Sequence, residues 1–208
     1  MKPVIIVNLK TYRQGKAALK LVKEISKVDK KIIIGVQATD ILETVKASKN
    51  PIYVQHVDFQ DVGRNTGFVL PEAVKSDGAM GVFLNHSEHR IDWGVLKKTV
   101  KRCRKVGLKV LIFSDSLKSA KKIKKLKPDY LVIEPPELVA GKVSVSKANP
   151  KLIEEIGKKL EYPFVIGAGI KTNEDLRIAM KFGAGGIAVS SAITKAKNPR
   201  KKLKELVG

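Results

Sequence analysis

The sequence has little of several residue types, and each scarcity excludes a class of protein. One cysteine in 208 residues excludes an intramolecular disulfide and a cysteine-rich metal site. Aromatic residues make up only 5% of the chain, so a base-stacking platform for single-stranded nucleic acid is not evident. No apolar run approaches the roughly 18 residues that a membrane helix needs. The first apolar run, at 3–7, is too short for a secretory signal, and we expect a cytoplasmic location.

Acidic residues are scarce as well, because 20 Asp and Glu stand against 41 Lys and Arg, which gives a formal net charge of +21. Such a charge raises the question of nucleic-acid binding. The lysines, however, are interleaved with apolar residues at helical spacing, which is typical of the solvated outer faces of separate helices. We therefore favour a solvated basic surface that attracts anionic substrates, and keep contact with a polyanion as the alternative.

What the chain does contain is a regular alternation of short β-branched runs and longer amphipathic stretches. Hydrophobic residues make up 43% of the sequence, enough for a substantial core. The apolar runs predict strands at 3–7, 32–36, 52–54, 80–84, 108–113, 130–133, 163–166 and 186–189. The stretches between them predict helices at 15–28, 39–48, 70–77, 92–106, 116–126, 148–160, 173–182 and 198–207.

Eight strand–helix units without a linker favour an α/β fold, a (β/α)8 TIM barrel that forms a single domain over residues 1–208. The predicted strands are apolar on both faces, as parallel strands covered by helices should be. Residues typical of helix starts, Asp40, Asp92, Ser116 and Asn173, stand at predicted helix boundaries. A six-stranded doubly wound sheet is the alternative architecture.

Functional groups of such barrels lie where the strands end, so the residues that follow each apolar run are the candidates for chemistry. A carboxylate after the sixth run, Glu134, can act as a general base. Lys10 after the first run and His86 after the fourth can stabilise a developing oxyanion. Glycine and serine after the last two runs, at Gly169, Ser190 and Ser191, can offer backbone N–H groups to a phosphate. This set predicts proton abstraction beside a carbonyl in a small phosphorylated molecule.

Each of these residues also has a purely structural interpretation. Glu134 could be a salt-bridge partner at the edge of the sheet, and His86 could be a hydrogen-bonded structural histidine. His86 and His89 could pair on a metal, but no third ligand is evident, so we expect no metal site. Cys103 lies in a basic helical stretch and is expected to be a small packing residue.

Three motifs then carry a resemblance to a known family. The segments VNLKTY at 7–12, NHSEHR at 85–90 and EPPELV at 134–139 are similar to those of triosephosphate isomerases, in the same order and on the corresponding strands. The similarity covers essentially the whole chain. Four further segments are similar to those of the compact archaeal branch of this family. They are QHVD at 55–58, NTGFVLPEAV at 65–74, VSVSKANP at 143–150 and GAGIKTNED at 167–175.

The resemblance implies an aldose–ketose isomerase of glycolysis and gluconeogenesis. It would interconvert D-glyceraldehyde 3-phosphate and dihydroxyacetone phosphate through an enediolate. Glu134 matches the base that shuttles the proton, and His86 matches the electrophile, which in the family acts as a neutral imidazole with its pKa lowered by a helix N-terminus. Lys10 matches the lysine that binds the substrate and stabilises the charge of the enediolate and of the phosphate. Asn8 matches its neighbour in the pocket, and Glu88 the carboxylate that organises Lys10 and the proton traffic.

The resemblance further implies a phosphate-binding site, a loop that closes over the substrate and a homo-oligomer. It implies no metal and no organic cofactor. The phosphate would be held at Val139, Gly169, Ser190 and Ser191. The lid would span 135–142, with Pro135 and Pro136 at one hinge and Ala140, Gly141 and Lys142 at the other. The segment 63–67, with Thr66 and Gly67, resembles a loop that inserts into a neighbouring subunit, so we expect a homodimer or homotetramer. A different phosphosugar barrel such as an epimerase, and a non-catalytic polyanion binder, are the alternatives.

Overall fold

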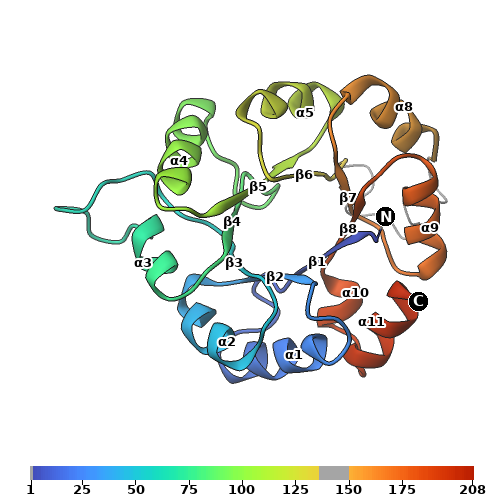
Figure 1. Ribbon diagram of the computed structural model, residues 1–208, viewed down its shortest axis with the longest axis horizontal. Coiled ribbons are helices and arrows are strands. Elements are labelled where there is room, and N and C mark those ends of the chain that lie inside the picture. Colours follow the sequence, from blue (N-terminus) through green and yellow to red (C-terminus); the bar gives the residue numbers. More distant parts are fainter. Residues whose placement is uncertain (1, 136–149) are drawn as a thin grey trace.

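Parallel strands form a closed barrel at the centre of the molecule (Figure 1). The computed structural model describes residues 2–135 and 150–208. Within these residues eight strands follow one another around the barrel, and β8 pairs with β1 to close it. The strands are β1 Val4–Asn8, β2 Ile33–Val36, β3 Ile52–Val54, β4 Gly81–Leu84, β5 Lys109–Ser114, β6 Tyr130–Ile133, β7 Val165–Gly167 and β8 Gly186–Val189. The closed order confirms the predicted TIM barrel and excludes a doubly wound sheet.

Helices surround the barrel as an outer ring (Figure 1). They are α1 Lys16–Ser26, α2 Ile41–Ala47, α3 Pro71–Ser76, α4 Trp93–Lys105, α5 Leu117–Ile123, α8 Pro150–Leu160, α9 Asn173–Lys181, α10 Ser191–Thr194 and α11 Pro199–Val207. Two short 3-10 turns, Ala38–Asp40 and Lys124–Leu126, precede α2 and follow α5. The sequence pattern did not predict α10, because a helix of one turn leaves no periodic signal in the sequence.

All four residues predicted to mark helix starts lie at such a start, and two of them cap the helix with their side chains. The Asp92 carboxylate accepts from the N–H of Gly94, and the Ser116 hydroxyl accepts from the N–H of Ser119. Asn173 is already inside α9, whose cap is Thr172 in a capping box with Asp175. Asp40 makes no cap bond; its Oδ1 instead accepts from the N–H of Gly15 at 2.9 Å, which ties α2 to the start of α1.

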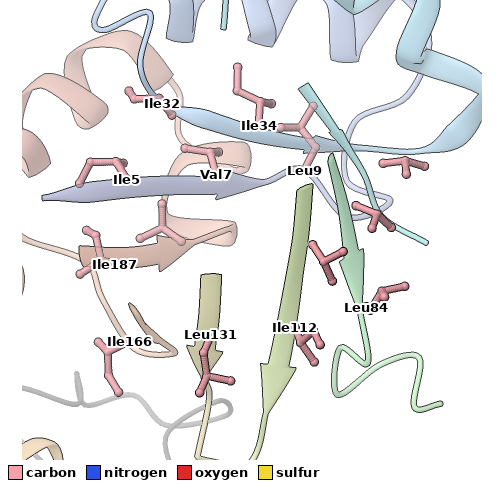
Figure 2. Close-up of a cluster of buried hydrophobic side chains, with 14 of the residues drawn as sticks. Ile5, Val7, Leu9, Ile32, Ile34, Leu84, Ile112, Leu131, Ile166 and Ile187 are labelled. Carbon is pink, nitrogen blue, oxygen red and sulfur yellow. The ribbon is translucent and has the colours of Figure 1, made fainter. Parts of the chain in front are cut away.

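Apolar side chains fill two separate cores, because each strand sends alternate residues to opposite faces of the sheet. In β1, Ile5 and Val7 pack toward the helices while Ile6 points into the barrel. Figure 2 shows the larger cluster, with Ile34, Leu84 and other residues from most of the strands. Cys103 is buried in this cluster, as expected of a packing residue.

Aromatic rings fill much of the barrel interior and leave no room for side chains at some neighbouring positions. Tyr53, Phe83 and Phe113 are all 2% exposed or less. A Cβ on Gly35 would lie 2.1 Å from Cε2 of Phe83, so only glycine fits beside that ring. Phe113 in turn packs edge-on against the His86 ring, with centroids 4.7 Å apart. The interior packing therefore extends directly to the candidate site.

The lysine runs lie on the solvent side of the helix ring, as predicted. Lys16, Lys20, Lys23 and Lys27 of the α1 region are exposed, while Leu21 and Ile25 are buried. Among the residues that the structure describes, no helix combines the length and the apolar character needed to cross a bilayer.

Candidate active site

Residues at the ends of all eight strands line two adjoining cavities at the carboxyl end of the barrel. The larger one, of about 530 Å³, is lined by Asn8, Lys10, Phe113, Glu134 and the loops that follow β7 and β8. The smaller one, of about 310 Å³, shares Asn8 and Lys10 and adds Gln55, His86 and Glu88. The structure thus brings together the residues that strand-end position singled out.

Lys10 is held in an unusual backbone conformation directly after β1. Its φ of 47° lies in the left-handed region, which few non-glycine residues adopt. Its N–H donates to Oδ1 of Asn8 at 3.0 Å, and Gln55 Nε2 donates to the same oxygen at 3.2 Å. The ammonium contacts Oε1 of Glu88 at 2.6 Å. Asn8, Gln55 and Glu88 therefore fix both the backbone and the charged end of Lys10.

His86 is a neutral imidazole with its ring proton on Nε2. The N–H of Glu88 donates to Nδ1 at 3.1 Å, so Nδ1 must carry a lone pair. Burial, with a further contribution from the positive charge of Lys10, lowers the pKa of His86 to about 4. The donor comes from a turn at residues 87 and 88, since α4 begins only at Trp93, so the helix N-terminus implied by the resemblance is absent here.

Glu134 follows β6 and faces His86. Its Oε2 lies 3.4 Å from Nε2 of His86, and its side chain is 14% exposed. Burial raises the pKa of Glu134 to about 7, while the positive charge of Lys10 opposes that shift. A carboxyl group whose pKa is close to neutral pH, next to an uncharged hydrogen-bond donor, suits proton transfer to and from carbon.

Two residues that support this geometry were not assigned a role from the sequence. A Cβ on Gly167 would lie 2.5 Å from both Cγ and Oε1 of Glu134, so the glycine makes room for the carboxylate. Asn85, with φ of 60°, donates from Nδ2 to Phe113 O at 3.0 Å and accepts from the N–H of Ile91 at 3.1 Å. These bonds shape the loop that carries His86. Both residues lie in recognised motifs, but only the contacts reveal what they do.

The positions expected to hold a phosphate line the larger cavity on the side of β7 and β8. Gly169, Ser190 and Ser191 all contribute to its wall. Gly169 has φ of 69°, and the preceding Ala168 has φ of 78°, so the loop turns sharply there. The Ser190 hydroxyl oxygen is buried and has no hydrogen-bond partner among the described residues.

Part of the expected lid and phosphate grip falls on residues that are not described. Pro135, at the first hinge, is buried directly after Glu134. Pro136, Val139, Ala140, Gly141 and Lys142 lie outside the described residues.

His89 contacts His86 through the backbone, where its N–H donates to the His86 carbonyl oxygen at 2.8 Å. Its ring stacks instead on His56, with centroids 4.2 Å apart, and His56 Nε2 lies 3.2 Å from Oδ1 of Asp58. In the described ranges no group of three or more His, Cys, Asp or Glu side chains is placed to hold a metal ion. The described residues therefore offer no third ligand to His86 and His89.

Comparison with known proteins relates this chain to one family over its full length. The family model described as triosephosphate isomerase matches residues 3–207. A triosephosphate isomerase of the archaeon Saccharolobus solfataricus is 41% identical over 215 aligned residues, which cover 99% of this chain and 95% of the relative. The triosephosphate isomerase of Methanocaldococcus jannaschii is 35% identical and covers 98% of both chains.

A solved structure shows the same fold at much lower sequence identity. The crystal structure of triosephosphate isomerase from Bartonella henselae superposes with a TM-score of 0.75 over 98% of each chain, at 19% identity. The barrel architecture is therefore shared well beyond the archaeal relatives. On the evidence of the family model and the full-length relatives, the chain belongs to the triosephosphate isomerase family.

Proposed function

We propose that the protein interconverts D-glyceraldehyde 3-phosphate and dihydroxyacetone phosphate in these two cavities, with Glu134 as the base. Family membership supplies the aldose–ketose isomerase activity and the triose phosphate substrate. The observation that supports the assignment of roles is the contact between a buried carboxyl, whose pKa is raised to about 7, and the Nε2 of a neutral imidazole. No other described carboxylate lines the larger cavity.

The proposed reaction moves one proton between two carbons and one between two oxygens, and it consumes nothing. The Glu134 carboxylate takes a proton from the carbon beside the carbonyl, and the C–H bonding electrons form the enediolate as the carbonyl oxygen gains negative charge. Glu134 then returns the proton to the adjacent carbon. The hydroxyl proton passes to the former carbonyl oxygen, so substrate and product differ in which carbon and which oxygen carry a hydrogen, and the enzyme is unchanged after each turnover.

Lys10 and His86 stabilise the charge that develops on oxygen. The Nε2–H of His86 donates to the oxygen and can do so because the lowered pKa keeps the ring neutral. The Lys10 ammonium supplies a positive charge, and Glu88 and Asn8 hold it in place. Because both donors are fixed before the substrate arrives, little reorganisation is needed during the reaction.

The phosphate of the substrate is proposed to bind beside Gly169, Ser190 and Ser191, with Val139 contributing from the segment at 135–142. The loops after β7 and β8 line the larger cavity and lie between β6 and β1 in the barrel order. Closure of 135–142 over the bound substrate would exclude water and protect the enediolate from losing its phosphate. A cytoplasmic, reducing setting fits this role and the single buried thiol.

A coupled assay on the purified protein tests the proposal. We expect interconversion in both directions, with each triose phosphate supplied alone. Deuterium from the solvent should appear on the carbon that gains the proton, because Glu134 can exchange its proton with water between the two steps. Absence of turnover in both directions would contradict the proposal.

We further propose a homo-oligomer in which the segment 63–67 of one copy reaches the site of another. Figure 1 shows the connection between β3 and α3 projecting away from the barrel. Val62 and Phe68, on either side of the segment, are 76% and 46% exposed, which is unusual for large apolar side chains. Thr66 and Gly67 at its tip would enter the smaller cavity of the partner, beside Lys10 and Glu88. Sedimentation equilibrium of the purified chain should show a dimer or tetramer rather than a monomer.

A further inference from the structure

The larger cavity is lined by lysines to which the proposed function assigns no role. Besides Lys10, its lining includes Lys171, Lys195 and Lys202. The charge of Lys10 is already matched by Glu88, at 2.6 Å. A phosphate monoester near neutral pH carries a charge of about −1.5 to −2, which backbone N–H groups alone would only partly balance. A further lysine of the lining can therefore contribute to balancing the phosphate charge.

Lys195 is held at this cavity by two contacts between the chain after β1 and the end of α10. Its ammonium lies 4.6 Å from the centre of the Tyr12 ring. In parallel, Arg13 Nε donates to the carbonyl oxygen of Thr194 at 3.0 Å. Tyr12 itself follows Lys10 by two residues. The same short connection thus places both Lys10 and Lys195 at the site.

The contact with Tyr12 positions the Lys195 charge without neutralising it. An aromatic face attracts an ammonium group, but it carries no net charge. No ion pair joins Lys195 to a carboxylate within the part of the chain that the structure describes. Lys202, half-buried on α11, adds a second positive charge to the same wall. An anion that enters beside Ser190 and Ser191 therefore meets an exposed ammonium group that lies over the Tyr12 ring and that no carboxylate of the described residues neutralises.

We infer that Lys195 is a further substrate-binding residue, which pairs with the dianionic phosphate of the substrate and is positioned by Tyr12. The inference rests on the proposed function of the cavity. It also narrows the substrate class, because a neutral sugar or a singly charged acid would gain less from this cation than a dianionic phosphate monoester.

Substitution of Lys195 by glutamine tests the inference against a matched control. Lys197, exposed in the same segment and outside the cavity lining, gives Lys197→Gln, which removes the same charge from the molecule. For Lys195→Gln we expect KM to rise roughly five- to tenfold while kcat stays within about twofold, as for a lost charge-assisted contact to the substrate. Lys197→Gln should shift KM by less than about twofold.

Titration with inorganic phosphate, followed by calorimetry, measures the same contact without turnover. The Kd for phosphate should rise in Lys195→Gln by a factor similar to that of KM, and should not rise in Lys197→Gln. Tyr12→Leu should weaken phosphate binding in the same direction, and Tyr12→Phe should restore most of the loss because it keeps the ring.

The outcomes separate the two proposals. Wild-type affinity for phosphate and wild-type KM in Lys195→Gln would overturn the inference and leave the isomerase proposal intact. If the wild-type chain were inactive, the isomerase proposal would fail, and the phosphate titration would still decide whether Lys195 binds the anion.

Discussion

At the scale of single residues, the surroundings of a side chain, more than its residue type, determine what it can do in this site. Glu134 and Glu88 are the same residue type, yet one is buried against His86 and the other is 59% exposed and paired with Lys10. Burial disfavours the charged form, so Glu134 acquires a pKa near neutrality. His86 loses its charge for the same reason. These contrasting environments place the proposed base, a neutral hydrogen-bond donor and an ion-paired lysine at one site.

The pH dependence of activity follows from the pKa of Glu134. A base must be ionised, and a pKa raised to about 7 means that the ionised fraction falls as the pH drops through neutrality. We expect kcat/KM to fall by about tenfold per pH unit well below that value. His86, with its pKa lowered to about 4, should add no inflection above pH 5. A profile of kcat/KM that stays flat from pH 8 to pH 5 would contradict this account.

The variant Gly167→Ala should reduce activity because the added methyl group displaces the Glu134 carboxylate, not because it contacts the substrate. The new methyl group would lie 2.5 Å from the Glu134 carboxylate, so the base must move. A displacement of the order of 1 Å costs about 100-fold in rate, and we expect kcat to fall by roughly 10- to 100-fold. In Gly185→Ala the nearest atom would be 3.5 Å away, so this control should keep wild-type kcat. Equal kcat values for the two variants would show that Gly167 does not constrain the base.

Residue-scale prediction from the sequence succeeded where position along a strand determines proximity. Asn8, Lys10, His86 and Glu134 follow apolar runs, and parallel strands bring their ends together whatever lies between them. Gly167 and Lys195 could not be assigned in this way. The role of Gly167 depends on a side chain 33 positions earlier, and Lys195 is one of many lysines until its contact with Tyr12 is known.

At the scale of elements, the alternation of apolar runs and amphipathic stretches predicted the strands and most of the helices. Strands such as β5 and β8 are buried on both faces, so their sequences read as continuous apolar runs. The short α10 and the bond from Gly15 to Asp40 were missed, because neither one turn of helix nor a contact between two loops leaves a periodic pattern.

The projecting connection between β3 and α3 depends on Arg102 of α4. This side chain, 12% exposed, donates to the carbonyl oxygens of Phe59 and Gln60 and pairs with Glu72 at 2.7 Å. Arg102→Leu should leave these groups without partners and lower the free energy of unfolding by about 2–4 kcal/mol. It should also weaken the oligomer, because the segment 63–67 loses its anchor.

Thermal unfolding and sedimentation of Arg102→Leu and Lys101→Gln measure both effects. Lys101 is exposed on the same helix and serves as the control for loss of a positive charge. An Arg102→Leu protein with wild-type stability and assembly would show that this cluster does not support the connection.

At the scale of the whole molecule, the net charge of +21 surrounds a site that takes an anion. The exposed lysines of the helix ring raise the local concentration of anionic substrate, and salt screens this effect over a Debye length of about 10 Å at 0.1 M. We expect kcat/KM to fall at least about threefold between about 20 and 300 mM NaCl, with a smaller change in kcat. A kcat/KM that is independent of salt would mean that the surface charge serves another purpose.

The central claim is that Glu134 carries the proton, and Glu134→Gln tests it most directly. Glutamine keeps the shape of the side chain but cannot accept the proton, so kcat should fall about 1000-fold and transfer of solvent deuterium to the substrate should be lost. Glu205→Gln, a substitution at an exposed position of α11, should keep the wild-type kcat and the transfer of solvent deuterium. If Glu134→Gln retained kcat within tenfold of the wild type and still transferred deuterium, another group would be the base and this account of the site would be wrong.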